Sequence, residues 1–160
     1  MLIATIVPKA HLNLIKDDTF FMALTHAAED SEYLGFFKRR ASEGKYVVLD
    51  NSTVELGEPE RFDRYLEKAI EIGAQEIVLP DWLGNADRTI KEMADKVPKL
   101  RKDHPDIKLM AVPQGGTYRE WIDCAARMME YKPNSLGISC RYTEMFGGGR
   151  TRAAIILYGM

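Results

Sequence analysis

The sequence contains little cysteine and little histidine, and this scarcity excludes several kinds of site. Two cysteines, Cys124 and Cys140, are too few for a four-thiolate zinc site or for the disulfide framework of a small secreted protein. The three histidines, His11, His26 and His104, are scattered, and none has a second ligand at metal-binding spacing. We therefore expect reduced thiols, no metal site and no cofactor.

An excess of one charge and a long apolar run are also missing. With 22 basic and 24 acidic residues the formal net charge is −2, so the whole-domain basic surface of many nucleic-acid-binding proteins is absent. No run approaches the ~20 apolar residues of a membrane span. The first residues, MLIATIVPKAH, lack the basic start and the apolar length of a signal peptide. These features predict a cytoplasmic protein without a membrane partner.

Short apolar runs alternate with segments of helical periodicity. The β-branched run Leu2–Pro8 predicts a first strand, and the segment from Asp17 to Gly44 predicts a helix, divided in two if the chain breaks near Asp30. Further strands are predicted at Lys45–Asn51, Glu76–Asp81, Ile107–Gln114 and Ser135–Cys140. Further helices are predicted at Glu58–Gly73, Asn85–Pro105 (disturbed at Pro98), Thr117–Lys132 and, as the start of a fifth helix, Thr151–Leu157.

The predicted strands are continuous apolar runs, which is typical of parallel strands covered on both faces. The fold class is therefore α/β, a parallel (β/α) repeat within one domain over residues 1–160. Two architectures fit this repeat: an incomplete TIM-type barrel of about five units, or an open doubly wound sheet. Five units are too few to close an eight-stranded barrel, which takes about 250 residues.

Polar residues and glycines follow the predicted strands. Asp50 ends the second strand, Asp81 ends the third, Gln114 and Gly115 end the fourth, and Gly137 lies within the fifth. In a parallel α/β fold these strand ends share one face. Carboxylates accept hydrogen bonds, an amide donates and accepts them, and a bare glycine lets a flat ring approach. The set suits a purine-like heterocycle and suits a phosphate poorly.

Each of these residues also has a purely structural interpretation. An aspartate after a strand often caps the next helix, and a pair of glycines often only turns the chain. The GGGR segment at Gly147–Arg150 lacks the strand and lysine of a phosphate-binding loop, which favours an ordinary loop. Trp82 and Trp121 are predicted to pack in the core, with the alternative that Trp82 lines a pocket beside Asp81.

Four stretches in this order resemble one family: VVLDNSTVELG, IVLPDWLGNADRT, AVPQGGTYREW and LGISCRY. Together they resemble the queuine/archaeosine tRNA-guanine transglycosylase family, closest to the phage and bacterial branch that places 7-deazaguanine bases in DNA. The resemblance extends from about Tyr46 to Tyr142, and its most specific part is Pro-Gln-Gly-Gly-x-Tyr. It implies a (β/α)8 barrel that exchanges guanine in a polynucleotide through a glycosyl–aspartate intermediate.

The resemblance also implies roles for single residues. Asp50 matches the family aspartate that serves as general acid/base, although Ser52 and Thr53 stand where the family has glycines. The residues that match the base-reading positions, and are therefore expected to bind substrate, are Asp81, Gln114, Gly115 and Gly137.

Two parts of the family pattern are absent from this sequence. The family's nucleophilic aspartate and its Cys/His zinc site both lie beyond the strands present here. Because base exchange needs a nucleophile to hold the sugar, the chain alone is expected to be inactive. The expected partners are a guanine or 7-deazaguanine base and nucleic acid, either DNA or tRNA. A self-associated dimer is also expected, through the first strand edge or the tail RTRAAIILYGM.

Three functions therefore remain open from the sequence. The first is guanine or 7-deazaguanine recognition for base exchange in DNA or tRNA. The second is a non-catalytic base-binding or assembly module. The third is an unrelated α/β enzyme that acts on a small polar metabolite through Asp50 and Asp81.

Overall fold

The computed structural model describes residues 4–139 and 142. Its strands are β1 (Phe20–Leu24), β2 (Tyr46–Asp50), β3 (Glu76–Val78), β4 (Lys108–Ala111) and β5 (Ser135–Leu136). Its α-helices are α1 (Ser31–Ser42), α2 (Thr53–Leu56), α3 (Phe62–Ile72), α4 (Ala86–Asp103) and α5 (Tyr118–Met129), with two 3-10 helices, η1 (Lys9–Ile15) and η2 (Ala27–Glu29).

The five strands form one parallel sheet in the order β1-β2-β3-β4-β5, which is also their order along the chain. Each strand lies beside its neighbours in the chain, so the connections all step in the same direction across the sheet. This is the strand order of a (β/α) barrel, whereas a doubly wound sheet reverses direction at a switch point. The predicted α/β repeat of five strands is therefore confirmed, and the strand order favours the barrel-type repeat over the doubly wound alternative.

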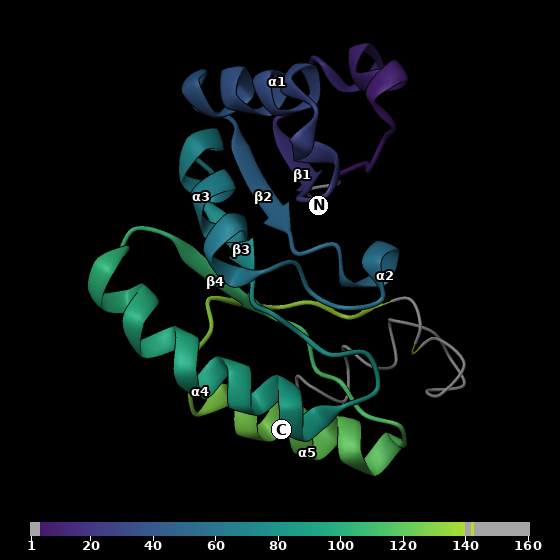
Figure 1. The fold of residues 1–160 in the computed structure, drawn as a ribbon, viewed down its shortest axis with the longest axis vertical. Helices are drawn as coiled ribbons and strands as arrows, with labels where there is room; N and C mark the ends of the chain where they lie inside the picture. Colours follow the sequence, from purple (N-terminus) through teal and green to yellow (C-terminus); the bar gives the residue numbers. More distant parts are fainter. Residues whose placement is uncertain (1–3, 140–141, 143–160) are drawn as a thin grey trace. The chain divides into compact units, whose positions relative to one another are not determined.

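The chain divides into two compact units. The described residues up to Val78, together with Asp106–Lys108, form the first, and the other described residues form the second. Within the first unit, β1 pairs with β2 from Phe20↔Tyr46 to Leu24↔Asp50, and β2 pairs with β3 at Val48↔Glu76. Each unit has its own helices (Figure 1).

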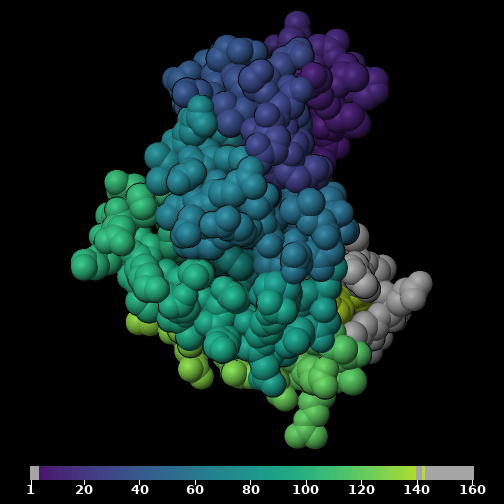
Figure 2. Space-filling model, in the orientation of Figure 1, coloured from purple at the N-terminus to yellow at the C-terminus, as the bar shows by residue number. Residues whose placement is uncertain are grey.

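Aromatic residues form much of the core of the first unit. Phe36 and Phe37 lie on the buried face of α1, and their rings lie 6.1 Å and 6.2 Å from the ring of Phe21 in β1, edge to face. Helix α1 begins where Asp30 accepts the backbone N–H groups of Glu32 and Tyr33, which is an ordinary N-cap. Segment η1 packs against α1, and the two appear side by side in purple and blue (Figure 2).

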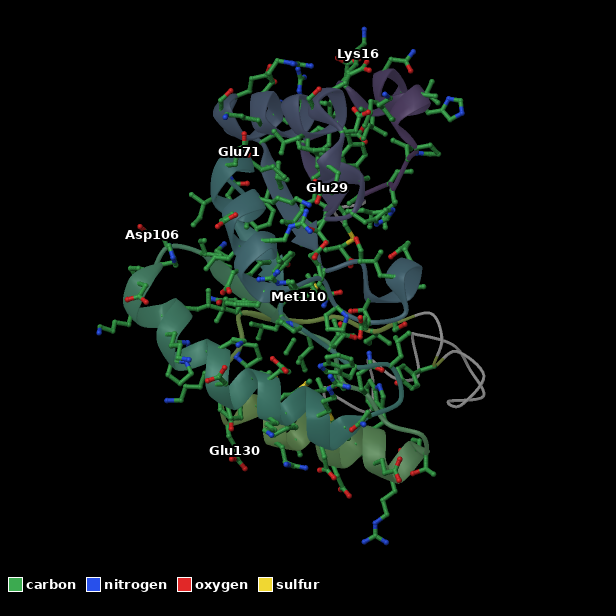
Figure 3. The ribbon with its side chains drawn as sticks, in the orientation of Figure 1. Lys16, Glu29, Glu71, Asp106, Met110 and Glu130 are labelled. Carbon is green, nitrogen blue, oxygen red and sulfur yellow. The ribbon has the colours of Figure 1, made fainter. Side chains whose placement is uncertain are left out.

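The second unit contains α4, β5, α5 and most of β4. Strand β4 pairs with β5 at Met110↔Ser135 and Ala111↔Leu136, and α4 packs along α5 (Figure 1). Helix α5 begins with a capping box, because Thr117 accepts the N–H of Glu120 while the Glu120 carboxylate accepts the N–H of Thr117. Charged side chains such as Glu130 point outward from this unit (Figure 3).

The predicted first strand is wrong. Of Leu2–Pro8, residues 4–8 are described and have no regular structure, and the side chain of Ile6 is half exposed. The first strand is instead Phe20–Leu24, within the segment that was predicted to be helical. Apolar residues at helical spacing misled that prediction, because a five-residue strand followed by a turn places Phe21, Leu24 and Ala28 at the same intervals.

Most other elements lie where the sequence predicts them. The break near Asp30 is confirmed as a helix start, and α3 ends at Gly73, which has a φ of 75°. Helix α2 was not predicted, and α4 continues through Pro98. The predicted fifth helix Thr151–Leu157, the end of the fifth strand at Cys140 and the GGGR segment lie outside the described residues. No helix in the described ranges is long and apolar enough to cross a membrane.

Candidate functional site

Asp81 and Gln114 are in direct contact in the second unit. Nε2 of Gln114 donates a hydrogen bond to Oδ2 of Asp81. Asp81 follows β3 and is nearly buried, and Gln114 follows β4 with a side chain that is fully buried. Burying a carboxylate is costly unless it is paired, so a buried carboxylate after a strand of a parallel sheet marks a candidate functional group.

Two further donors fix the orientation of the Gln114 side chain. Its Oε1 accepts the backbone N–H of Gly84 at 3.1 Å and the hydroxyl of Tyr142. A backbone N–H can only donate, so the atom that faces Gly84 must be the amide oxygen. The amide nitrogen is then the atom that faces Asp81. The orientation of the amide therefore follows from its neighbours.

Tyr142 is buried and links this network to the core of the second unit. Its hydroxyl oxygen accepts the N–H of Gly115 at 3.2 Å while it donates to Gln114. Its ring lies 6.1 Å from the ring of Trp121, in a cluster that also contains Ala125. The predicted core position of Trp121 is confirmed, since its side chain is fully buried.

The loop that carries Asp81 is tied to the start of α4. The N–H of Trp82 donates to Oγ1 of Thr89 at 2.8 Å, and the same hydroxyl lies 2.8 Å from the carbonyl oxygen of Asn85. Oδ1 of Asn85 accepts the N–H of Arg88 at 3.0 Å and caps α4. The Arg88 guanidinium carbon lies 3.0 Å from the centroid of the Trp82 ring, a cation–π contact. These contacts limit the freedom of the loop around Asp81.

Gly115 and Gly137 stand at positions where the packing leaves no room for a side chain. A Cβ atom at Gly115 would lie 2.5 Å from the backbone nitrogen of Trp121, so the start of α5 occupies the space that a side chain would need. A Cβ at Gly137 would lie 2.8 Å from Cγ2 of Val112. Both residues were predicted to bind substrate, and that role stays a prediction.

Asp50 lies in the first unit, at the end of β2. Its Oδ1 accepts the N–H of Ser52 at 2.7 Å, and its carbonyl oxygen accepts the N–H of Thr25 at 3.0 Å. Ser52 has a φ of 56°, which is uncommon for a residue other than glycine, and its hydroxyl accepts the N–H of His26 at 3.3 Å. Backbone strain of this kind is often found at functional positions, so Asp50 remains a candidate catalytic residue.

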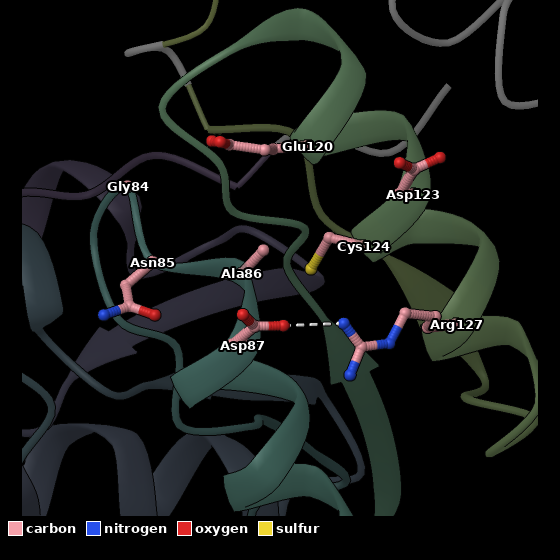
Figure 4. Close-up of a pocket in the computed structure, with 8 residues that line it drawn as sticks. All are labelled: Gly84, Asn85, Ala86, Asp87, Glu120, Asp123, Cys124 and Arg127. Carbon is pink, nitrogen blue, oxygen red and sulfur yellow. Dashed lines mark hydrogen bonds and ion pairs between the residues drawn. The ribbon is translucent and has the colours of Figure 1, made fainter.

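A cavity of about 290 Å³ opens between the start of α4 and one face of α5 (Figure 4). Asp87 and Arg127 form an ion pair of 2.8 Å at its edge. Two of its lining residues also contact Gln114, because Gly84 donates to the side chain and Cys124 accepts the backbone N–H at 3.5 Å. The full lining consists of Gly84, Asn85, Ala86, Asp87, Glu120, Asp123, Cys124 and Arg127.

Cys124 is fully buried, and burial raises the pKa of its thiol above the ordinary value. A thiol with a raised pKa is protonated at neutral pH and is a poor nucleophile. Cys124 therefore fits a structural role. Among the described residues, no group of three or more histidine, cysteine, aspartate and glutamate side chains is placed to hold a metal ion.

No protein-family model and no curated protein matches this sequence. Among solved structures, the chain is similar to an orotidine 5'-monophosphate decarboxylase from Sulfolobus solfataricus, with 17% sequence identity and a TM-score of 0.49. The match covers 94% of this chain and 65% of that protein, so the chain spans about two thirds of the decarboxylase. At this identity the likeness concerns the fold alone.

The predicted function in guanine or 7-deazaguanine base exchange is corrected. The structural comparison gives a decarboxylase in place of a transglycosylase. The side chain of Gln114 is fully buried and its carbonyl oxygen accepts two hydrogen bonds from the protein, and its predicted role in binding substrate stays a prediction. No comparison bears on the family resemblance itself, which stays a prediction.

Sequence reasoning identified Asp81 and Gln114 but missed the residues that hold them. Tyr142 ends the LGISCRY stretch, and nothing in that stretch indicates that its hydroxyl contacts Gln114. Thr89 lies one helical turn after the start of α4, and a buried hydroxyl does not stand out in the apolar periodicity of a helix. The sequence signal that remains for Tyr142 is an aromatic residue with a polar tip just after the last strand, a type that usually finds a hydrogen-bond partner when buried.

Proposed function

We propose that this chain belongs to an α/β enzyme that acts on a small polar molecule, with Asp81 as the functional carboxylate of the second unit. The observation that carries the proposal is the buried contact between Asp81 and the oriented amide of Gln114. Carboxyl ends of parallel strands are where α/β enzymes place catalytic groups. A carboxylate held there is suited to accept an N–H or O–H of a substrate, or to transfer a proton.

In this contact the protein itself orients the Asp81 carboxylate. Gln114 supplies one N–H to Oδ2 of Asp81, and Gly84 and Tyr142 keep that N–H in place. The carboxylate is thus oriented by the folded protein before a ligand binds, so ligand binding does not have to supply that free energy. A cavity of about 290 Å³ lies in the same unit, and although Gly84 and Cys124 of its lining contact Gln114, Asp81 is not among its lining residues.

Asp50 is proposed as a second, independent candidate. It ends β2 in the first unit and accepts the N–H of Ser52, whose backbone is strained. Its contribution is tested separately from that of Asp81, because each aspartate stands in its own unit and has its own hydrogen-bond partners.

The experiment is a ligand screen by thermal shift and ligand-observed NMR with small polar metabolites that carry N–H and C=O groups. Four proteins are compared: the wild type, Asp81→Asn, Asp50→Asn and Asp106→Asn. Asp106 is exposed, so its amide variant is a control for the loss of one negative charge. A compound that binds at Asp81 should lose about tenfold or more in affinity with Asp81→Asn and should bind Asp106→Asn like the wild type.

The variants also separate the two aspartates. An equal loss of ligand affinity in Asp81→Asn and in Asp50→Asn would mean that the binding of one compound depends on both aspartates. Unchanged affinity of every binding compound in Asp81→Asn, in a protein that keeps its thermal stability, would overturn the role of Asp81. A screen in which no compound binds the wild type would count against a small-molecule enzyme and favour the non-catalytic assembly module.

A further inference from the structure

We infer that Tyr142 is a positioning residue that acts on Asp81 through Gln114. The inference rests on the proposed function, in which Asp81 is the functional carboxylate. Tyr142 donates its hydroxyl hydrogen to Oε1 of Gln114, and Nε2 of Gln114 donates to Asp81. The tyrosine therefore stands one residue behind the carboxylate, with the amide between them.

The direction of the tyrosine hydroxyl is fixed by the backbone. A phenol has one hydrogen to donate, and its oxygen can also accept. The N–H of Gly115 lies 3.2 Å from that oxygen and can only donate to it. The hydroxyl hydrogen of Tyr142 is then directed at Gln114. A phenylalanine in this place would lose both interactions and keep the ring.

The ring itself is held by packing. Tyr142 is 6% exposed, and its ring meets Trp121 at a centroid distance of 6.1 Å and an interplanar angle of 55°. Trp121 belongs to α5, whose start also packs against Gly115. The hydroxyl is thus placed by the same contacts that place the loop between β4 and α5.

The amide of Gln114 has one wrong orientation, with Oε1 against Asp81. That arrangement would bring two acceptors together and leave the N–H of Gly84 facing the amide nitrogen, which is also a donor. Gly84 and Asp81 still disfavour it when the tyrosine hydroxyl is removed. Loss of the Tyr142 hydroxyl removes about one hydrogen bond from the Gln114 amide. The amide should therefore become more mobile without inverting its orientation.

The test follows the side-chain amide of Gln114 by NMR on the full chain without ligand. The resonance is assigned as the one that disappears in Gln114→Met, a substitution of similar size. In Tyr142→Phe, exchange of the Gln114 amide hydrogens with solvent should be about fivefold faster than in the wild type, which corresponds to the loss of one ordinary hydrogen bond. Tyr131→Phe, the same chemical change elsewhere in the second unit, should leave that exchange rate unchanged.

The outcomes are distinguishable from those of the ligand screen, because no ligand is used. If Tyr142→Phe lowers stability while the Gln114 amide keeps its chemical shift and exchange rate, Tyr142 only packs and the inference is overturned. If Tyr142→Phe does not fold, the wild-type spectrum decides instead. A hydroxyl hydrogen of Tyr142 protected from exchange is then expected, and rapid exchange of that hydrogen would overturn the inference.

Discussion

Nε2 of Gln114 donates to Oδ2 of Asp81, and this contact joins the loops that follow two strands of the parallel sheet. The amide is fully buried and its oxygen is already occupied by Gly84 and Tyr142. Gln114 therefore acts within the protein as the partner of a carboxylate.

The first prediction concerns two glycines, Gly115, which has no room for a Cβ atom, and Gly35, which has room for one. Gly115→Ala should lower the free energy of unfolding by about 2 kcal/mol or more, because its Cβ would lie 2.5 Å from the backbone of Trp121. Gly35→Ala, within α1, should raise the free energy of unfolding by about 0.5–1 kcal/mol, because a helical glycine is costly and its Cβ would have an ordinary contact of 3.5 Å with Arg39. Urea unfolding of both variants measures the difference, and equal effects of the same sign would contradict it.

The second prediction concerns the start of α5, which supports Gly115. Thr117→Ala should cost about 1 kcal/mol in the free energy of unfolding, because the capping hydroxyl that accepts the N–H of Glu120 is lost. Thr117→Ser keeps that hydroxyl and should cost only a small fraction of this. Thermal and urea unfolding of the pair measure the effect. A serine variant as unstable as the alanine variant would show that the threonine methyl group, rather than the cap, matters.

The third prediction is a pH dependence in the first unit. The hydrogen bond from Lys68 is the largest cause that lowers the pKa of Glu29 below its usual value, and the charge of Arg64 adds to it. A lowered pKa in the folded state means stability that is present above the unfolded pKa of about 4.3 and is lost as the pH falls through the folded value.

Glu29→Gln should therefore be less stable than the wild type at pH 7, by less than about 1 kcal/mol because the carboxylate is half exposed. The difference should shrink below about pH 4. Glu67→Gln, at an exposed position on α3, serves as the control for the loss of one surface carboxylate. A difference between Glu29→Gln and the wild type that stays constant from pH 7 to pH 3 would refute the linkage.

The fourth prediction concerns the thiol beside the cavity. Because burial raises the pKa of Cys124, its reaction with a thiol reagent at pH 8 should be about tenfold or more slower in the folded protein than after unfolding. The Cys140→Ser variant leaves Cys124 as the single thiol for this measurement. Fast labelling of the folded variant would show that the cavity admits reagents to the sulfur.

Much of the fold follows from the sequence, for reasons that particular residues make clear. Buried runs such as Tyr46–Asp50 and the turn at Gly73 have unambiguous local signals. Strand β1 was missed because five residues are too few to show a period of two against a period of 3.6. The predicted α/β class is correct despite this error, because the alternation of the remaining strands and helices still requires parallel strands.

The site was predictable only in part. Asp81 and Gln114 stand at strand ends, and parallel strands bring such ends to one edge. The orientation of the Gln114 amide depends on Gly84 and Tyr142, which are 30 and 28 residues away. No local pattern encodes which of two amide atoms faces a carboxylate. The sequence does not indicate that protein donors occupy the oxygen of Gln114, and the substrate-binding role of Gln114 stays a prediction.

The measurement that tests the account most directly is the mapping of a binding compound on the protein by two-dimensional NMR. The compound with the highest affinity in the metabolite screen is titrated into labelled wild-type protein. We predict the largest shifts at the side-chain amide of Gln114 and at the backbone N–H groups of Gly84 and Gly115, and their loss in Asp81→Asn. Shifts confined to Asp123, Arg127 and other residues of the open cavity, and unchanged in Asp81→Asn, would contradict the central role of Asp81.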